Sequence, residues 1–397
     1  MSAGAAHEPG PDHGGAPPSP AARPDTTRPL HILHIIPTLG VGGTERQLVQ
    51  LLLRMDPKRT RHTVCFYTRT PSLEADLNAA GIRTIFFDKF AMRPWSFFAR
   101  LRRTVRETSP DVVHTWLYSG NFWGRLAALS CGVRRLVSSD RGMVVRAPFA
   151  VRLYERLLAP LTLRLVNSQA TAASLVEKYG LPPAGIRVVP NAVEEAAAAP
   201  GARDAVRASL GLPPEQRLVL LVARQSAEKN HAMFFRAARR VAAARPDVTF
   251  VAVGHLVDPG AMQRVLDASG AAASVRLVGE QADIPRWLMA ADIFCLTSDR
   301  EGLPNALLEA MAAGLPVVCT RFPSATEVLS GERLGVLVPV NDDASLAAAI
   351  LALLGDDERR RAMGRAAREH VAAAYGWERL LREMDAIYAG LDAHRGA

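Results

Sequence analysis

Short apolar runs alternate along most of this chain with longer stretches in which apolar residues recur every three or four positions. The runs are typical of strands buried on both faces, and the stretches are typical of helices that cover a sheet. In the first half the runs predict strands at 29–36, 62–67, 83–87, 112–114, 135–138 and 165–168. In the second half they predict strands at 217–223, 249–253, 275–278, 293–296, 317–319 and 335–338. This alternation predicts βαβ units, parallel sheets and an α/β fold.

The alternation pauses near residues 188–192, where a stretch rich in Glu, Ala, Pro and Gly begins. Such a pause predicts a linker between two similar doubly wound domains, and 397 residues suit two domains. We therefore expect a disordered tail at 1–29, a first domain at 30–193, a second at 194–376 and a terminal helix at 377–397. The tail is rich in Gly, Ala and Pro and lacks the apolar core of a signal peptide.

Composition narrows the class of protein. No apolar run reaches the ~18 residues that a membrane-spanning helix needs. The four cysteines are scattered and form no Cys-x-x-Cys pair, so we expect reduced thiols without chemistry in a cytoplasmic protein. The net charge is +9, and residues 31–200 alone contain 23 Lys and Arg against 12 Asp and Glu. Such an imbalance predicts an anionic partner for the first domain.

One segment of the first domain suggests what that partner is. In the segment 93–106, Trp95, Phe97 and Phe98 stand beside four arginines at positions 100, 102, 103 and 106, and a second basic stretch follows at 146–164. This mixture is expected of an amphipathic helix that lies on an anionic membrane surface. The alternative is a solvated helix whose aromatic side chains pack into the first core.

The segment from 297 to 320 carries the most specific pattern of the chain. Glu301 and Glu309 bracket a turn that opens a helix directly after a buried strand, with Pro304 suited to the first helical position and Gly314 to the cap. Ligands of open α/β folds bind at this edge of the sheet. The Glu309 carboxylate can accept hydrogen bonds from two sugar hydroxyls there. The alternative is an ordinary amphipathic helix with a solvated Glu309.

In each domain, the loop after the first strand carries a further candidate site. Gly42 and Gly43 open a helix whose backbone N–H groups can approach an anion, unless they only form a tight turn. The loop is not the dinucleotide fingerprint, because Glu45 stands at the third glycine position and no acidic residue lies between Lys58 and Glu74. These departures argue against NAD.

Arg224 and Lys229 lie in the corresponding loop of the second domain. A diphosphate group bound at this loop would need positive charge beside it. The chain has no Asp-x-Asp that would hold a metal ion for that purpose. An arginine fork and a lysine point charge can supply that charge directly, so we expect no metal and no cofactor. The alternative is a pair of solvated loop charges.

The segment Ser298…Glu301-Gly302…Glu309-Ala-Met-Ala-x-Gly314-x-Pro-Val-Val resembles the Glu-x7-Glu motif of glycosyltransferase family 4. That family has the GT-B architecture, two Rossmann-like domains with a cleft between them, and transfers sugars from nucleotide donors with retention of configuration. The resemblance covers nearly all of residues 31–390, although Asn230 replaces a family glycine. It implies a hexosyltransferase in the synthesis of cell-surface polysaccharide or glycolipid.

The resemblance also implies a set of site residues. The donor sugar is expected beside Glu301, Gly302, Leu303, Pro304 and Asn305, the ribose beside Glu309, and the diphosphate beside Arg224 and Lys229. The loop of Gly279 is expected near the base, and Gly42 and Gly43 face the donor across the cleft. His114 matches a histidine near the donor sugar, although a lone strand-end histidine is more often structural. Asp140 and Arg141 are expected to meet the acceptor.

The implied partners are a nucleotide-sugar donor and a glycan or lipid-linked acceptor, with no nucleic acid, in the cytoplasm or on the inner face of the plasma membrane. A nucleotide-sugar epimerase of the same architecture stays open as an alternative, and an NAD-dependent oxidoreductase is disfavoured by the glycine loop. A two-domain solute-binding protein would need an export signal. A glycoside hydrolase would need its carboxylates on either side of the sugar, whereas Glu301 and Glu309 share one loop and helix.

Overall fold

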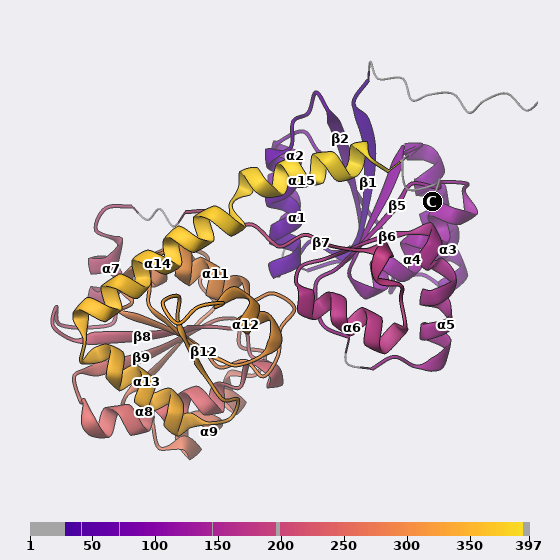
Figure 1. The fold of residues 1–397 in the computed structure, drawn as a ribbon. Coiled ribbons are helices and arrows are strands. Elements are labelled where there is room, and N and C mark those ends of the chain that lie inside the picture. The colour runs from indigo at the N-terminus through magenta and orange to yellow at the C-terminus, as the bar shows by residue number, and fades with distance from the viewer. Residues whose placement is uncertain (1–27, 41, 71, 145, 196–198, 392–397) are drawn as a thin grey trace, which may run out of the picture.

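The computed structural model describes residues 28–40, 42–70, 72–144, 146–195 and 199–391, and it contains two separate parallel sheets (Figure 1). The predicted tail lies outside the described residues apart from its last two. The first sheet consists of β1 (Leu30–Thr38), β2 (Thr60–Thr68), β3 (Arg83–Phe86), β4 (Val112–Trp116), β5 (Leu136–Asp140), β6 (Leu163–Val166) and β7 (Ile186–Val188). The second consists of β8 (Arg217–Val222), β9 (Val248–Val253), β10 (Val275–Gly279), β11 (Ile293–Leu296), β12 (Val317–Thr320) and β13 (Val336–Val338).

Both sheets are doubly wound. The strand orders are β3-β2-β1-β4-β5-β6-β7 and β10-β9-β8-β11-β12-β13, so the order reverses beside the first strand of each domain. Every predicted strand is present within a few residues, and the α/β prediction with two Rossmann-like domains is confirmed. Strand β7 was not predicted, because its three residues lie at a sheet edge and only partly enter the core.

Helices connect successive strands. The first domain has α1 (Gly43–Arg54), α2 (Glu74–Ala79), α3 (Pro94–Thr108), α4 (Leu117–Ser130), α5 (Phe149–Leu158) and α6 (Gln169–Tyr179). The second has α7 (Ala202–Ser209), α8 (His231–Ala244), α9 (Pro259–Ser269), α10 (Ile284–Ala290), α11 (Asn305–Ala312), α12 (Pro323–Val328), α13 (Asp343–Leu354) and α14 (Asp357–Tyr375). The last helix is α15 (Trp377–Ala389).

The two faces of the first sheet bury different helices, because successive residues of a strand point to opposite faces. Ile32 and Val64 pack with α1 and α15 on one face, whereas Leu33 and Cys65 pack with α3 and α4 on the other. The second domain forms one larger core around β8, β9 and β11. The four cysteines are free thiols, three of them buried and Cys131 partly buried.

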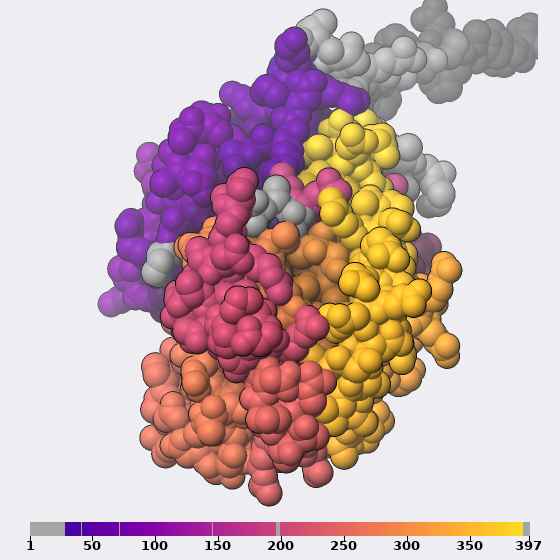
Figure 2. Space-filling view, turned by 90° about the vertical axis from the view of Figure 1, so that its left-hand side faces the viewer, coloured from indigo at the N-terminus to yellow at the C-terminus, as the bar shows by residue number. Residues whose placement is uncertain are grey.

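The terminal helices join the two halves. Figure 2 shows α14 and α15 as one ridge that runs along both halves of the molecule. Leu380, Met384 and Tyr388 of α15 belong to the core of the first domain. The chain that leaves the first domain is tied to this ridge where the Val193 amide donates to the Tyr375 carbonyl at 3.0 Å. Among the described residues, no helix combines the length and apolar character needed to cross a bilayer.

Candidate active site

Lys229 and Glu301 form an ion pair at the strand-end edge of the second sheet. Lys229 Nζ lies 2.7 Å from Glu301 Oε2, and the Ser298 hydroxyl donates to Glu301 Oε1 at 2.6 Å. The side chains keep 18% and 14% of their surface exposed, so a ligand can reach both. The pair therefore presents a fixed positive and negative charge to the space outside β8 and β11.

The loop before α8 holds Lys229 in this position. Asn230 adopts the left-handed conformation with φ of +49°, as expected for a substitute of glycine, and its side chain accepts from the Met233 amide to cap α8. The Asn230 amide group also donates to Asp299 at 3.0 Å, and the Thr297 hydroxyl donates to the Lys229 carbonyl at 2.9 Å. These bonds join the loop of Lys229 to the loop of Glu301.

Glu309 lies in α11, eight residues after Glu301. Among the described residues, no side chain or backbone group bonds or pairs with its carboxylate. Burial raises the pKa of Glu309 to about 7, and the positive charge of Arg46 on α1 opposes the shift. A partly buried carboxylate without a partner costs stability, which favours a role in binding a ligand.

The two domains meet at the glycine-rich turn of this same loop. A Cβ atom on Gly302 would lie 2.5 Å from the Arg141 carbonyl oxygen, so only glycine allows this approach. The Ser168 hydroxyl donates to the Gly302 carbonyl at 2.5 Å. The donor-side loop of the second domain therefore closes directly against β5 and α6 of the first.

Asn305 makes the second contact between the domains. Its side-chain oxygen accepts from Asn191 at 2.6 Å, and its nitrogen donates to the Gly43 carbonyl at 3.5 Å. A Cβ atom on Gly43 would lie 3.0 Å from that nitrogen. The glycine loop thus faces the start of α11 across the boundary between the domains, and the N-terminal ends of α1 and α11 lie next to each other.

Arg224 completes the charges at this cleft. Its side chain is exposed. Burial raises the pKa of Glu45 on α1, and the positive charge of Arg224 opposes that shift. A Cβ atom on Gly42 would collide with the Glu45 carboxylate, which folds back over the glycine loop. Arg224 is therefore close enough to the first domain for its charge to act across the cleft.

Comparison with known proteins assigns the fold and the pattern to one family. A model described as "Glycosyltransferase Family 4" matches residues 41–197, and one described as "Glycosyl transferases group 1" matches residues 202–370. The chain belongs to glycosyltransferase family 4.

Named relatives of this family-4 chain include D-inositol 3-phosphate glycosyltransferases. That of Catenulispora acidiphila, number 2, is 30% identical over 57% of this chain and 55% of its own length. That of Segniliparus rotundus is 31% identical over 56% of this chain and 51% of its own length. The chain thus spans about half the length of these curated relatives.

Among solved structures, Anabaena HepE in complex with UDP matches with a TM-score of 0.79 and 19% identity over 91% of this chain and 100% of its own. A glycosyltransferase from Rickettsia africae gives a TM-score of 0.81 at 20% identity over 93% and 100%. These neighbours show the GT-B fold.

His114, expected near the donor sugar, lies inside the first domain. The side chain is fully buried, and its two ring nitrogens lie 2.7 Å from the Tyr388 hydroxyl and 2.8 Å from the Ser139 hydroxyl. The ring stacks on Trp116 at 4.3 Å, and burial lowers its pKa well below the ordinary value. His114 therefore fastens α15 to the sheet, and its ring is covered by protein groups in this structure.

Asp140 and Arg141, expected to meet the acceptor, are partly exposed and are held by hydrogen bonds and ion pairs within the protein. The Asp140 carboxylate accepts from Asn121 at 3.0 Å and from Arg164 at 2.9 Å. The Arg141 guanidinium donates to the Asn191 side chain at 2.8 Å. Burial raises the pKa of Asp140 and lowers that of Arg141 to about 10. Their side chains position β5 and the linker, while the Arg141 backbone meets Gly302.

The other predicted positions form the frame of the site. Leu303 and Pro304 are buried, and Pro304 precedes the helix instead of starting it, because α11 begins at Asn305. Gly314 takes a φ of +73° just after α11, as predicted for a cap. Gly279 ends β10 with a φ of +70°, and its carbonyl accepts from the Gly254 amide. The sequence analysis missed Arg46, Ser168 and Asn191, since their importance depends on contacts between the domains.

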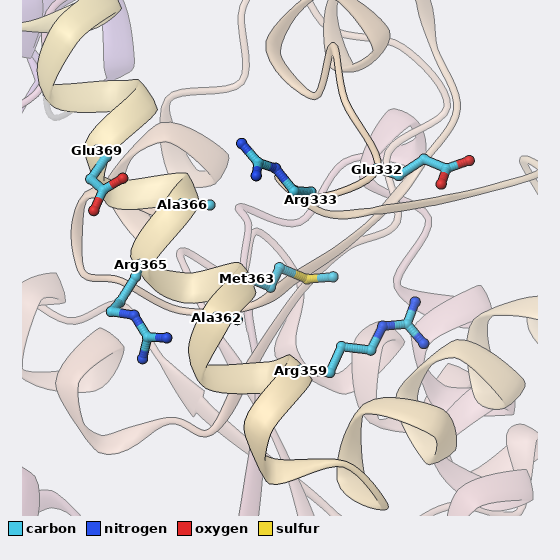
Figure 3. Close-up of a pocket in the computed structure, with 8 residues that line it drawn as sticks. All are labelled: Glu332, Arg333, Arg359, Ala362, Met363, Arg365, Ala366 and Glu369. Atoms are coloured by element: carbon cyan, nitrogen blue, oxygen red, sulfur yellow. The ribbon is translucent and has the colours of Figure 1, made fainter.

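A separate pocket of about 460 Å³ lies on the second domain between α14 and the loop that follows α12 (Figure 3). Its lining residues are Glu332, Arg333, Arg359, Ala362, Met363, Arg365, Ala366 and Glu369. Figure 3 shows that the arginine side chains point in different directions rather than toward one point. None of the predicted site residues lines this pocket, so it is distinct from the cleft.

Proposed function

We propose that this protein is a retaining glycosyltransferase that moves a hexose from a nucleoside-diphosphate sugar to a hydroxyl group, in polysaccharide or glycolipid synthesis. The observation that carries the proposal is the position of the Lys229–Glu301 pair at the strand ends, with the buried Glu309 in α11 and Gly43 of the first domain at the start of that helix. Support comes from the relatives' names and from neighbours solved with UDP and with UDP-glucose.

The charges at the cleft suit a departing diphosphate. Lys229 supplies a point charge beside the loop that opens α11, whose free N–H groups favour an anion, and Arg224 supplies a planar fork from the loop after β8. The start of α1 approaches from the other side. Positive charge from the protein thus stabilises the leaving group as its bond to the sugar breaks, so turnover requires no divalent metal.

The carboxylates then divide the rest of the donor between them. Glu309 accepts hydrogen bonds from the two ribose hydroxyls, and these bonds favour its ionised form and offset the cost of burial. Glu301, fixed by Ser298 and Lys229, accepts from hydroxyls of the sugar and positions it. Because Glu301 is paired with a lysine, it acts as a positioning group and not as a nucleophile.

The configuration at the anomeric carbon is retained because the acceptor attacks the same face of the sugar from which the diphosphate leaves. A bond forms between the acceptor oxygen and the anomeric carbon while the bond to the diphosphate oxygen breaks. The departing phosphate oxygen takes the acceptor's proton. No covalent intermediate with the protein is required.

A ligand screen by thermal unfolding tests the proposal. UDP, GDP, ADP and their common sugars are added to the wild type, to Lys229→Ala and to Lys58→Ala, which removes an exposed lysine far from the cleft. One donor at a hundred times its Kd should add about 2.7 kcal/mol to the stability of the wild type and Lys58→Ala. The gain should fall in Lys229→Ala and survive excess EDTA.

If no nucleotide or nucleotide sugar raises the stability of the wild type, the proposal is refuted. Stabilisation by NADH alone would favour an oxidoreductase. Conversion of a donor into another nucleotide sugar without an acceptor would identify an epimerase.

A further inference from the structure

Helix α5 has the reverse of the usual polarity. Its one buried residue is Glu155, whose carboxylate accepts from Arg125 at 2.7 Å and also pairs with Arg164. Both arginines are buried, and Arg164 continues to Asp140 at 2.9 Å. The inner face of this helix is therefore fastened by a buried ionic network, which leaves its apolar residues elsewhere.

The outer face of α5 carries those apolar residues as one exposed stripe. Phe149, Leu153 and Leu157 follow one another at four-residue intervals, which places them on one side of the helix, and Leu161 follows at the same spacing. Their exposed fractions are 78%, 48%, 66% and 51%. Single exposed apolar residues are ordinary, but a continuous row of large ones marks an interaction surface.

The exposed charged residues of the α5 segment itself are all positive. Arg146, Arg152 and Arg156 are exposed, and the single acidic residue between 141 and 164 is the inward-facing Glu155. Apolar side chains between arginines complement an anionic phospholipid surface, with the chains among the lipids and the guanidinium groups at the phosphates. A second copy of the same face would instead bring arginines against arginines.

The structure also corrects the expectation for α3. Phe97 is buried among Tyr67, Phe87 and Trp123, and Phe98 is partly buried against Trp123. Trp95 alone of the three predicted aromatics is exposed. Figure 1 places α3 and α5 together on the side of the first domain that faces away from the second. Trp95 can therefore flank a surface that is centred on α5.

We propose that α5 docks this protein on an anionic bilayer, with Phe149, Leu153, Leu157 and Leu161 inserted at the headgroup level. This inference rests on the proposed function, because the bilayer would present a lipid-linked acceptor. The segment that leads to α5 begins at Arg141 and Gly142, which touch Gly302 of the donor-side loop. The segment that leads to the docking helix thus starts at the donor-side loop, although α5 itself lies on the side of the first domain that faces away from the second.

The test uses the full chain and co-sedimentation with phosphatidylcholine vesicles, with and without phosphatidylglycerol. Leu153→Asn with Leu157→Asn removes the stripe, and Arg146→Glu with Arg152→Glu reverses two charges. Val257→Asn with Val265→Asn removes exposed apolar residues from the second domain as a matched control. We expect the wild type to bind only vesicles that contain the anionic lipid. Either α5 variant should bind these vesicles at least about tenfold more weakly. The control should bind as the wild type does.

Equal recovery with neutral and anionic vesicles, or an α5 stripe variant that binds like the control, would overturn the proposal. A dimer of the wild type that the stripe variant loses in sedimentation velocity would identify a second copy as the occupant and also overturn it. Donor-induced thermal stabilisation, measured on every variant, shows that each is folded. Its presence without vesicle binding refutes the docking alone, whereas its absence in the wild type refutes the proposed function.

Discussion

Replacing Glu309 by Gln should stabilise the protein while weakening donor binding. The pKa of Glu309 rises from its ordinary 4.5 to about 7 because burial disfavours the charge. In the folded state the carboxyl therefore keeps its proton at pH values where the unfolded state has released it. Stability is thus lost as the pH rises from 4.5 to 7 and stays low above that window. Gln has nearly the same shape and carries no charge, so it avoids this loss.

The size of the effect follows from the shift. One pKa unit corresponds to about 1.36 kcal/mol, so a shift from 4.5 to about 7 sets an upper limit of about 3 kcal/mol. Partial exposure of the side chain reduces the gain, and we expect about 1–3 kcal/mol at pH 8. Below pH 4.5 the two proteins should be equally stable, since both side chains are then neutral.

Urea unfolding of the wild type, Glu309→Gln and Glu369→Gln at pH 5, 6, 7 and 8 measures this dependence. Glu369 is exposed on α14 and serves as the control, which should match the wild type throughout. The gain for Glu309→Gln should grow with pH, while the donor KM rises more than kcat changes, because a ribose contact exists in both ground and transition states. A gain that is absent, or equal at pH 5 and pH 8, would refute the reasoning.

Three further predictions concern the cleft and the core. Lys229→Ala should lose about 2–4 kcal/mol of transition-state stabilisation, measured as kcat/KM, and Lys58→Ala should lose none. Gly302→Ala places a methyl group 2.5 Å from the Arg141 carbonyl. It should cut turnover about a hundredfold by separating the domains while donor binding survives, whereas Gly331→Ala, with open space around it, should be silent; equal turnover of the two would contradict the closure. Burial lowers the pKa of His62 and His231 to about 4. Each should cost about 1.4 kcal/mol of stability per pH unit as the pH falls from 6.5 to 4. Urea unfolding at several pH values measures this loss. If the unfolding free energy of His231→Gln falls with pH as steeply as that of the wild type, the prediction is wrong.

The fold was largely predictable because its signals are local. Strands such as β8 and β11 are buried on both faces, so they appear in the sequence as uninterrupted apolar runs. The left-handed Asn230 and the cap at Gly314 were predictable for the same reason, since turn chemistry depends on neighbouring residues. The loop that opens α11 follows from its own sequence, except that Pro304 lies one residue outside the helix.

Contacts between distant parts of the chain could not be predicted. His114 was expected at a strand end, but β4 continues to Trp116, and Tyr388 returns from the last helix and covers the ring. Asp140 also lies at a strand end, yet Arg164 and the network of Glu155 engage it. The polarity of α5 could not be inferred from periodicity alone, because an apolar stripe normally faces the core. The buried arginines that reverse it come from α4 and β6.

The most direct test of the central claim follows the anomeric proton of the donor by NMR. The donor selected by the ligand screen is incubated with the protein and simple alcohols or water as acceptor, and spectra are recorded before the product can mutarotate. Our account predicts release of the nucleoside diphosphate and a first-formed product with the anomeric configuration of the donor, with or without EDTA. A product of inverted configuration, or conversion of the donor without release of the nucleotide, would contradict it.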